Sequence, residues 1–188
     1  AAIAIIPPFV MFGMHDYQRN RVLTFMNPEA DPSGTGYNII QSKIALGSGG
    51  VLGKGYGLGS QSQLEFLPER HTDFIFAVIG EELGLFGTLA TLLLLSILIF
   101  SIFKLALRAH DPMVRYVASG FGCWIAIQTI LNIGSAISVM PVVGVTLPLV
   151  SYGGSALIAT YMGIGFVLGA ARRDPAIYKE LQESGIKW

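Results

Sequence analysis

The residues best suited to chemistry lie where a polar stretch of the sequence runs into a long apolar one. Arg70, His71 and Asp73 stand close together at this boundary. Ionisable side chains at the edge of an apolar segment are costly to bury, so they are typical of places where something uses them. A carboxylate there could act as a general base, and an arginine could bind a phosphate through its bidentate guanidinium group. We therefore expect the working site at Asp73.

A second interpretation gives Asp73 a structural role only. Thr72 or Asp73 could cap the helix expected from residue 74, and the loss of such a cap costs about 1 kcal/mol. A carboxylate at a helix N-terminus is favoured in its ionised form, which weakens it as a base, whereas desolvation acts in the opposite direction. Spacing alone supports the capping and catalytic roles equally. For His71 we expect a hydrogen bond to the site rather than catalysis.

A glycine-rich stretch at residues 47–59 precedes this boundary and carries Lys54. It does not fit the Walker phosphate loop, which would need glycine in place of Ser48 and serine or threonine in place of Gly55. Glycines still allow a ligand to approach the backbone, and Lys54 would bring a cation to it. A phosphate contact and a simple flexible turn are about equally supported. Lys43 is a further candidate phosphate contact.

The composition indicates a membrane protein. The mean hydropathy is +0.59, 52% of residues are hydrophobic and 13% are charged, and the apolar residues come in blocks. Twelve basic residues balance twelve acidic ones, and no nucleic-acid-binding motif is present, so we expect no nucleic-acid partner. Cys123 has no partner cysteine and the histidines are scattered, so we expect neither a disulfide nor a structural metal site. No cofactor is predicted with certainty, and a divalent-cation requirement stays open.

The apolar runs predict an all-α polytopic membrane protein. We expect about three full transmembrane helices, the end of a fourth, a long extracytoplasmic loop with short amphipathic helices, and a re-entrant Pro/Gly-rich turn. In chain order the expected segments are the end of a transmembrane helix at 1–14, the long loop at 15–73, a transmembrane helix at 74–103, a cytoplasmic turn at 104–115, a transmembrane helix at 116–140, the re-entrant turn at 141–154, a transmembrane helix at 155–171 and a cytoplasmic tail at 172–188. The first run is too short to span a bilayer alone, so we expect this chain to be a fragment of a larger polytopic protein.

Within the long loop, residues 17–26 and 37–46 each place apolar side chains at helical spacing. Short interfacial helices and a loop packed on the protein are equally supported there. Gln128, Asn132 and Ser135 share one face of a spanning helix, and hydrogen bonding between helices is favoured for them over a substrate role.

Glu81 and Glu82 lie inside the first apolar run. For both glutamates, burial against a partner on the missing part of the protein is favoured over catalysis.

Basic residues in the short connections set the expected orientation. Lysine and arginine occur in the turn at 104–115 and in the tail, whereas the turn at 141–154 has none. The positive-inside rule places the first two in the cytoplasm. Asp73 and the long loop then share the outer face with Ser151 and Tyr152 of the re-entrant turn, which are candidate substrate contacts.

Several runs closely resemble the SEDS family (shape, elongation, division and sporulation). They are Gly-Tyr-Asn-Ile-Ile-Gln-Ser-Lys-Ile-Ala-Leu-Gly-Ser-Gly-Gly from residue 36, Gln-Leu-Glu-Phe-Leu-Pro-Glu-Arg-His-Thr-Asp-Phe-Ile-Phe-Ala-Val from residue 63, Glu-Glu-Leu-Gly from residue 81, Asn132, and Met-Pro-Val-Val-Gly-Val-Thr-Leu-Pro-Leu-Val-Ser-Tyr-Gly-Gly-Ser from residue 140. The resemblance covers nearly the whole chain in order. The Gln-Ser-Gln-Leu-Glu-Phe-Leu-Pro-Glu-Arg run is more similar to the rod-shape branch of the family, while Thr146 stands where many rod-type members have proline, which leaves the division branch open.

The resemblance implies an inverting peptidoglycan glycosyltransferase of the bacterial cytoplasmic membrane, which polymerises lipid II on the outer face. It implies a class B penicillin-binding protein, the transpeptidase, as the partner. The family's catalytic aspartate matches Asp73, which favours the catalytic role over the cap. The amino-terminal half of the family's fold is missing, so this chain alone is expected to be inactive. The alternatives are a lipid II flippase and a membrane scaffold that activates the penicillin-binding protein.

Overall fold

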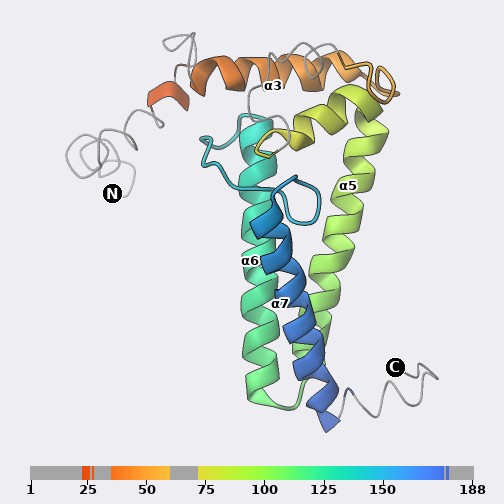
Figure 1. Ribbon diagram of the computed structural model, residues 1–188, viewed down its shortest axis with the longest axis vertical. Coiled ribbons are helices and arrows are strands. Elements are labelled where there is room, and N and C mark those ends of the chain that lie inside the picture. Colours follow the sequence, from red (N-terminus) through yellow and green to blue (C-terminus); the bar gives the residue numbers. More distant parts are fainter. Residues whose placement is uncertain (1–22, 26, 28–34, 60–71, 176, 178–188) are drawn as a thin grey trace, which may run out of the picture. The chain divides into compact units, whose positions relative to one another are not determined.

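The computed structural model describes residues 23–25, 27, 35–59, 72–175 and 177, and the regular structure in these ranges is entirely helical. The principal helices are α3 (Thr35–Gly49), α5 (Ile75–Arg108), α6 (Pro112–Ala136) and α7 (Gly154–Arg173) (Figure 1). The last three are long and apolar enough to cross a membrane. The all-α polytopic class is therefore confirmed. The expected end of a further spanning helix at 1–14 lies outside the described residues.

The helix bounds differ from those expected at the connection between α5 and α6. α5 runs past residue 103 to Arg108, and α6 already begins at Pro112, so the turn is shorter than the expected 104–115. Lys104 and Arg108 fit in the last turns of a spanning helix because long basic side chains reach from an apolar stem to a polar surface. Proline suits the first helical position, and Asp111 Oδ1 accepts a hydrogen bond from the Met113 N–H at 2.9 Å.

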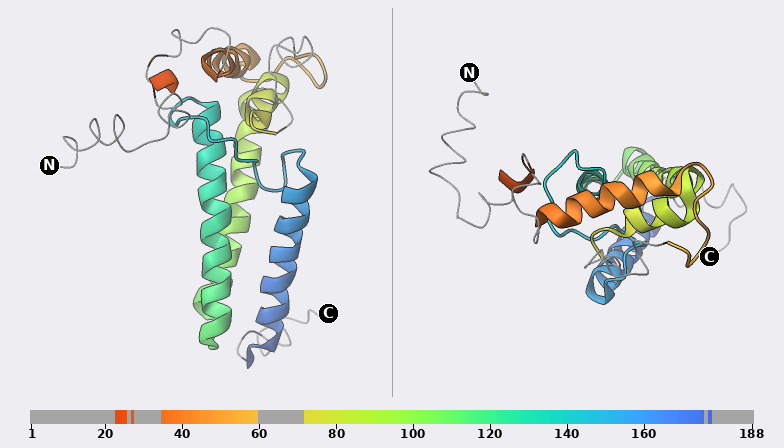
Figure 2. Two further views of the ribbon diagram at one scale, coloured as in Figure 1. Left: turned by 60° about the vertical axis from the view of Figure 1, so that its left-hand side comes forward. Right: turned by 90° about the horizontal axis from the view of Figure 1, so that it is seen from above.

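The described chain divides into two compact units. The first contains the described residues up to Thr88 together with Leu131–Val145, and the second contains Leu89–Ile130 and the described residues from Thr146 onward. In the first unit α3 lies across the first turns of α5 (Figure 2). The Ser42 Oγ of α3 donates a hydrogen bond to the Ala136 carbonyl at 2.8 Å.

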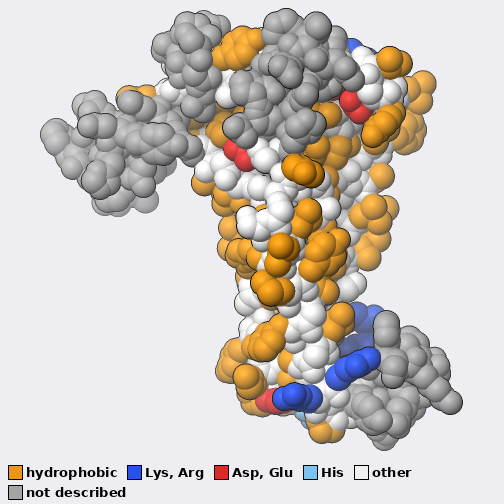
Figure 3. Space-filling model, viewed as in Figure 1, with side chains coloured by type: hydrophobic (Ala, Val, Ile, Leu, Met, Phe, Trp, Pro, Cys, Tyr) orange, Lys and Arg blue, Asp and Glu red, His pale blue; other side chains and the backbone are white. Residues whose placement is uncertain are grey.

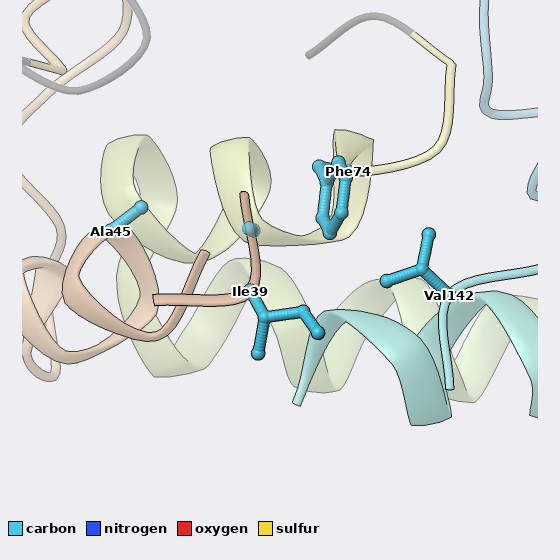
Figure 4. Packing of buried hydrophobic residues seen from close by; sticks show 5 residues of the cluster. Ile39, Ala45, Phe74 and Val142 are labelled. Atoms are coloured by element: carbon cyan, nitrogen blue, oxygen red, sulfur yellow. The ribbon is translucent and has the colours of Figure 1, made fainter. Parts of the chain in front are cut away.

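The buried residues of α3 recur every three or four positions, which gives the helix one packing face. They are Gly36, Ile39, Ser42, Ala45 and Gly49. Ile39 and Ala45 pack with Phe74, Ala77 and Val142 in one apolar cluster (Figure 4). The helix expected at 37–46 is thus present as α3. Of the helix expected at 17–26, residues 23–25 are described and are helical.

In the second unit, α5, α6 and α7 run side by side (Figure 1). Ile102, Ala106, Ala118 and Val167 form one apolar cluster between them, and Ala109, Val114, Ala171 and Ile177 form another. On the face shown in Figure 3, lysine and arginine side chains gather where α5 and α7 end, and hydrophobic side chains cover the helices above. This distribution matches a helix bundle that passes from an apolar layer into water.

A buried carboxylate, that of Asp174, binds the backbone of the turn between α5 and α6 in the second unit. Asp174 is fully buried, and its Oδ2 accepts hydrogen bonds from the backbone N–H groups of His110 and Asp111, both at 2.7 Å. These bonds connect the end of α7 to the turn between α5 and α6. The sequence contained no pattern that assigned this role to Asp174.

The Pro/Gly-rich segment between α6 and α7 has no regular helix or strand from residue 141 to residue 153. Gly144 and Leu149 have positive φ angles of 76° and 62°, which a continuous helix cannot accommodate. The Leu147 N–H donates a hydrogen bond to Ser151 Oγ at 2.7 Å and closes the turn that leads into α7. The irregular backbone was expected, and its depth in the membrane stays a prediction.

α5 is broken at Gly84, where φ is 65° and ψ is −157°. The transmembrane helix expected at 74–103 corresponds to α5, and its break at Gly84 was not predicted. This backbone conformation is essentially restricted to glycine, because a Cβ would clash with the neighbouring backbone. A Cβ at Gly84 would also overlap the backbone nitrogen of Gly53. The glycine at the break therefore allows α5 and the glycine-rich stretch to approach each other closely.

Candidate active site

Asp73 lies in the turn that immediately precedes α5 and is half-buried. Its backbone carbonyl accepts a hydrogen bond from Asn132 Nδ2 at 3.0 Å. The next residue, Phe74, is only 2% exposed and is anchored among Ile39 and Val142 (Figure 4). The carbonyl of Asp73 and the residue that follows it are thus both held in place, which limits where the Asp73 carboxylate can lie.

The Pro/Gly-rich segment borders the Asp73 carboxylate at Gly144. A Cβ built on Gly144 would lie 3.5 Å from Asp73 Oδ2, so the glycine brings bare backbone next to the carboxylate. The following residue, Val145, accepts a second hydrogen bond from Asn132 Nδ2 through its carbonyl, at 2.7 Å. One side-chain amide therefore binds both Asp73 and the segment beside it.

Lys54 forms an ion pair with Glu81, with 2.8 Å between Lys54 Nζ and Glu81 Oε1. The Glu81 side chain is fully buried, and the Lys54 side chain is 29% exposed. A buried carboxylate needs such a partner because desolvation of the charge is costly. The partner of Glu81 was expected outside this chain, but the structure supplies it from the glycine-rich stretch.

Backbone hydrogen bonds run in both directions between the glycine-rich stretch and the broken part of α5. The Lys54 and Gly55 N–H groups donate to the carbonyls of Glu81 and Glu82, each at 3.0 Å, and the Leu85 N–H donates to the Gly50 carbonyl at 3.0 Å. In a continuous helix the two glutamate carbonyls would accept from residues four positions later. The break at Gly84 releases these groups, and the glycine-rich stretch binds them.

Of the remaining candidates from the sequence, Lys43, Ser151 and Tyr152 lie among the described residues. Lys43 is exposed and lies outside the buried face of α3, and Arg70 and His71 lie outside the described residues. In the second unit, Ser151 Oγ binds the Leu147 N–H, while Tyr152 is 81% exposed. Their substrate-binding roles stay predictions, as does the phosphate contact of Lys54.

Two residues lie next to Asp73, namely Asn132 and Gly144. Neither was among the site residues predicted from the sequence. The signal for Asn132 was its place in a polar face of α6, and the signal for Gly144 was its place in a broken apolar segment. Within the described ranges, no group of three or more His, Cys, Asp or Glu side chains is arranged to hold a metal ion.

Together, the helices and the site define a multi-pass membrane protein with a half-buried aspartate at the start of a spanning helix. The chain belongs to the FtsW, RodA and SpoVE family of cell cycle proteins, which it matches over residues 1–175. This confirms the family that the motifs indicated.

Two curated relatives illustrate the match. The chain is 56% identical over 165 residues to the peptidoglycan glycosyltransferase MrdB of Escherichia coli (strain K12), covering 88% of this chain and 45% of that protein. It is 42% identical over 173 residues to the probable peptidoglycan glycosyltransferase FtsW of Geobacter metallireducens, covering 91% and 46%. The chain thus spans about half the length of the curated relatives it matches.

Solved structures also match this chain. One is a chain from a peptidoglycan synthase complex whose study concerned the structural coordination of polymerization and crosslinking. It is 38% identical and superimposes with a TM-score of 0.74, covering 93% of this chain and 47% of that one. A mutant of the rod shape determining protein RodA from Thermus thermophilus is 41% identical, with a TM-score of 0.56 and coverage of 70% and 40%.

Proposed function

We propose that this chain, in the full-length setting of its relatives, forms the catalytic part of a peptidoglycan glycosyltransferase. The enzyme polymerises lipid II into glycan strands for cell-wall elongation and rod shape. The identity of 56% to MrdB, against 40–47% to several FtsW proteins, supports the elongation role over the division role.

The observation that carries this proposal is the setting of Asp73. The residue is half-buried rather than sealed among packed helices, and its backbone carbonyl is bound by Asn132. A general base needs both properties, because it must reach the substrate and must be held within hydrogen-bond distance of the proton it takes.

In the proposed reaction, Asp73 accepts the proton of a sugar hydroxyl while the hydroxyl oxygen attacks the anomeric carbon of the second substrate. The bond between that carbon and the lipid pyrophosphate oxygen breaks, and the configuration at the carbon is inverted. Cations stabilise the charge that develops on the departing pyrophosphate. Arg70 and Lys43 are the proposed contacts, and Lys54 would have to exchange Glu81 for a phosphate to take part.

We place the enzyme in the bacterial cytoplasmic membrane, with Asp73 on the extracytoplasmic face. The basic residues at the ends of α5 and α7 support this orientation under the positive-inside rule. The proposed partner is a class B penicillin-binding protein. The similarity to a chain from a complex that coordinates polymerization and crosslinking supports this partner.

The test is the Asp73→Asn substitution in the full-length protein with its penicillin-binding partner, assayed for glycan strands made from purified lipid II. We expect polymer to be lost while partner binding is kept, which would also reject a pure scaffold. The matched control is Asp111→Asn, because Asp111 is an exposed aspartate at the start of another spanning helix.

Undiminished polymer from Asp73→Asn would overturn the catalytic assignment. The flippase alternative is tested by measuring lipid II translocation in liposomes with the same variant. A transporter that uses Asp73 would lose translocation in this assay.

A further inference from the structure

We infer that Asn132 is the positioning residue of the active site: its side-chain amide holds both the Asp73 backbone and the segment that borders the Asp73 carboxylate. This inference rests on the proposed catalytic role of Asp73. It differs from the expectation for the polar face of α6, which was hydrogen bonding between helices only.

The contacts of Asn132 use its whole donor capacity. The residue lies in α6 and is 1% exposed. Its Nδ2 donates to the Asp73 carbonyl at 3.0 Å and to the Val145 carbonyl at 2.7 Å, and an amide nitrogen has two hydrogens to donate. The two acceptors are 59 and 13 residues away in sequence. A single planar group therefore connects α6 with two segments that are distant from each other in sequence.

Both accepting carbonyls lie in irregular backbone. Asp73 lies in the turn before α5, and the nearby Ala77 N–H bonds to the Phe74 carbonyl at 2.9 Å. Val145 lies in the segment without regular structure. The Asn132 amide supplies a donor to both carbonyls.

The chemistry of Asn132 also distinguishes it from a residue that only packs helices. Its Oδ1 is buried and has no hydrogen-bond partner among the described residues, which is unfavourable for stability. Ser135, also buried and one turn further along α6, donates its hydroxyl to the Asn132 carbonyl at 2.8 Å, within its own helix. Ser135 is therefore a matched control with a buried polar group on the same helix.

The expected consequence concerns rate rather than binding. Gly144 lies next to the Asp73 carboxylate and directly before Val145, so loss of the amide would let the carboxylate and this backbone move apart. Reaction rates depend steeply on the position of the reacting groups, and a displacement of about 1 Å can cost about a hundredfold. We expect kcat to fall by about ten- to a hundredfold, with KM changed by less than about threefold.

The experiment uses the full-length protein with its penicillin-binding partner and purified lipid II. Asn132→Asp keeps the shape and Oδ1 but replaces the donating NH₂ with an oxygen, and Asn132→Ala removes the group. Ser135→Ala is the control and Asp73→Asn the reference. Each variant is assayed for kcat and KM, and for hydrogen–deuterium exchange of backbone amides in residues 72–78 and 141–146. The exchange measurement does not depend on activity.

We expect both Asn132 variants to lower kcat and to speed exchange in the two segments, while Ser135→Ala changes neither. A folded Asn132→Asp protein with wild-type kcat, or unchanged exchange in both segments, would overturn the inference. Failure of both Asn132 variants to fold would overturn it too, because Asn132 would then be a folding residue. If Asp73→Asn retains activity, the proposed function fails, and the exchange data still decide whether Asn132 positions this region.

Discussion

Replacing Lys54 with methionine should undock the glycine-rich stretch from α5. The change keeps an unbranched side chain of similar length but removes the ammonium group that lies 2.8 Å from the fully buried Glu81 carboxylate. Coulomb's law at an effective dielectric constant of about 20 gives about 6 kcal/mol for two unit charges at this distance. Part of this attraction offsets the desolvation of Glu81, and breaking a buried pair costs about 3–5 kcal/mol.

The exposure of Lys54, 29% of its side chain, places the expected loss at the lower end of that range, at about 3 kcal/mol, because water screens the pair. A loss of this size shifts the docking equilibrium of the stretch by about a hundredfold. The Lys54 and Gly55 N–H groups, which bond to α5, should then exchange with deuterium faster by about the same factor. Exchange of these amides and the thermal unfolding midpoint in detergent are the measurements.

The double variant Lys54→Met with Glu81→Leu is the decisive control. Since it removes both charges, it should recover most of the lost stability, as apolar replacements of buried pairs commonly do. A Lys54→Met effect below about 1 kcal/mol, or a double variant as unstable as the sum of the single ones, would refute the reasoning. A raised KM for lipid II in a stable double variant would instead indicate that Lys54 contacts phosphate.

Two further predictions concern the backbone contacts of each unit. Gly84→Ala places a Cβ against the Gly53 nitrogen at a positive φ of 65°, so we expect faster proteolysis of residues 50–55, and an unchanged cleavage rate would contradict the tight contact. Asp174→Ala leaves the His110 and Asp111 N–H groups without the carboxylate oxygen that they share. It should lower stability by about 2–3 kcal/mol, measured as the thermal midpoint in detergent. An unchanged midpoint would show that Asp174 does not hold the turn.

Much of the architecture could be predicted because it depends on local sequence. The spanning helices α5, α6 and α7 follow from apolar runs long enough to cross a bilayer, and the irregular segment after α6 follows from its prolines and glycines. Helix ends were less predictable. Lys104 and Arg108 suggested a turn, yet their apolar stems allow them to stay in α5.

The sequence by itself determined the helical class, the family and the position of Asp73 at the start of a spanning helix. Only the tertiary structure decided which groups meet: Lys54 with Glu81, and Asn132 with Asp73. Composition and periodicity report the environment of each residue along the chain, whereas these contacts join residues 27 and 59 positions apart. Such pairs depend on how helices cross and where backbone breaks, as at Gly84, and neither leaves a repeating pattern in the sequence.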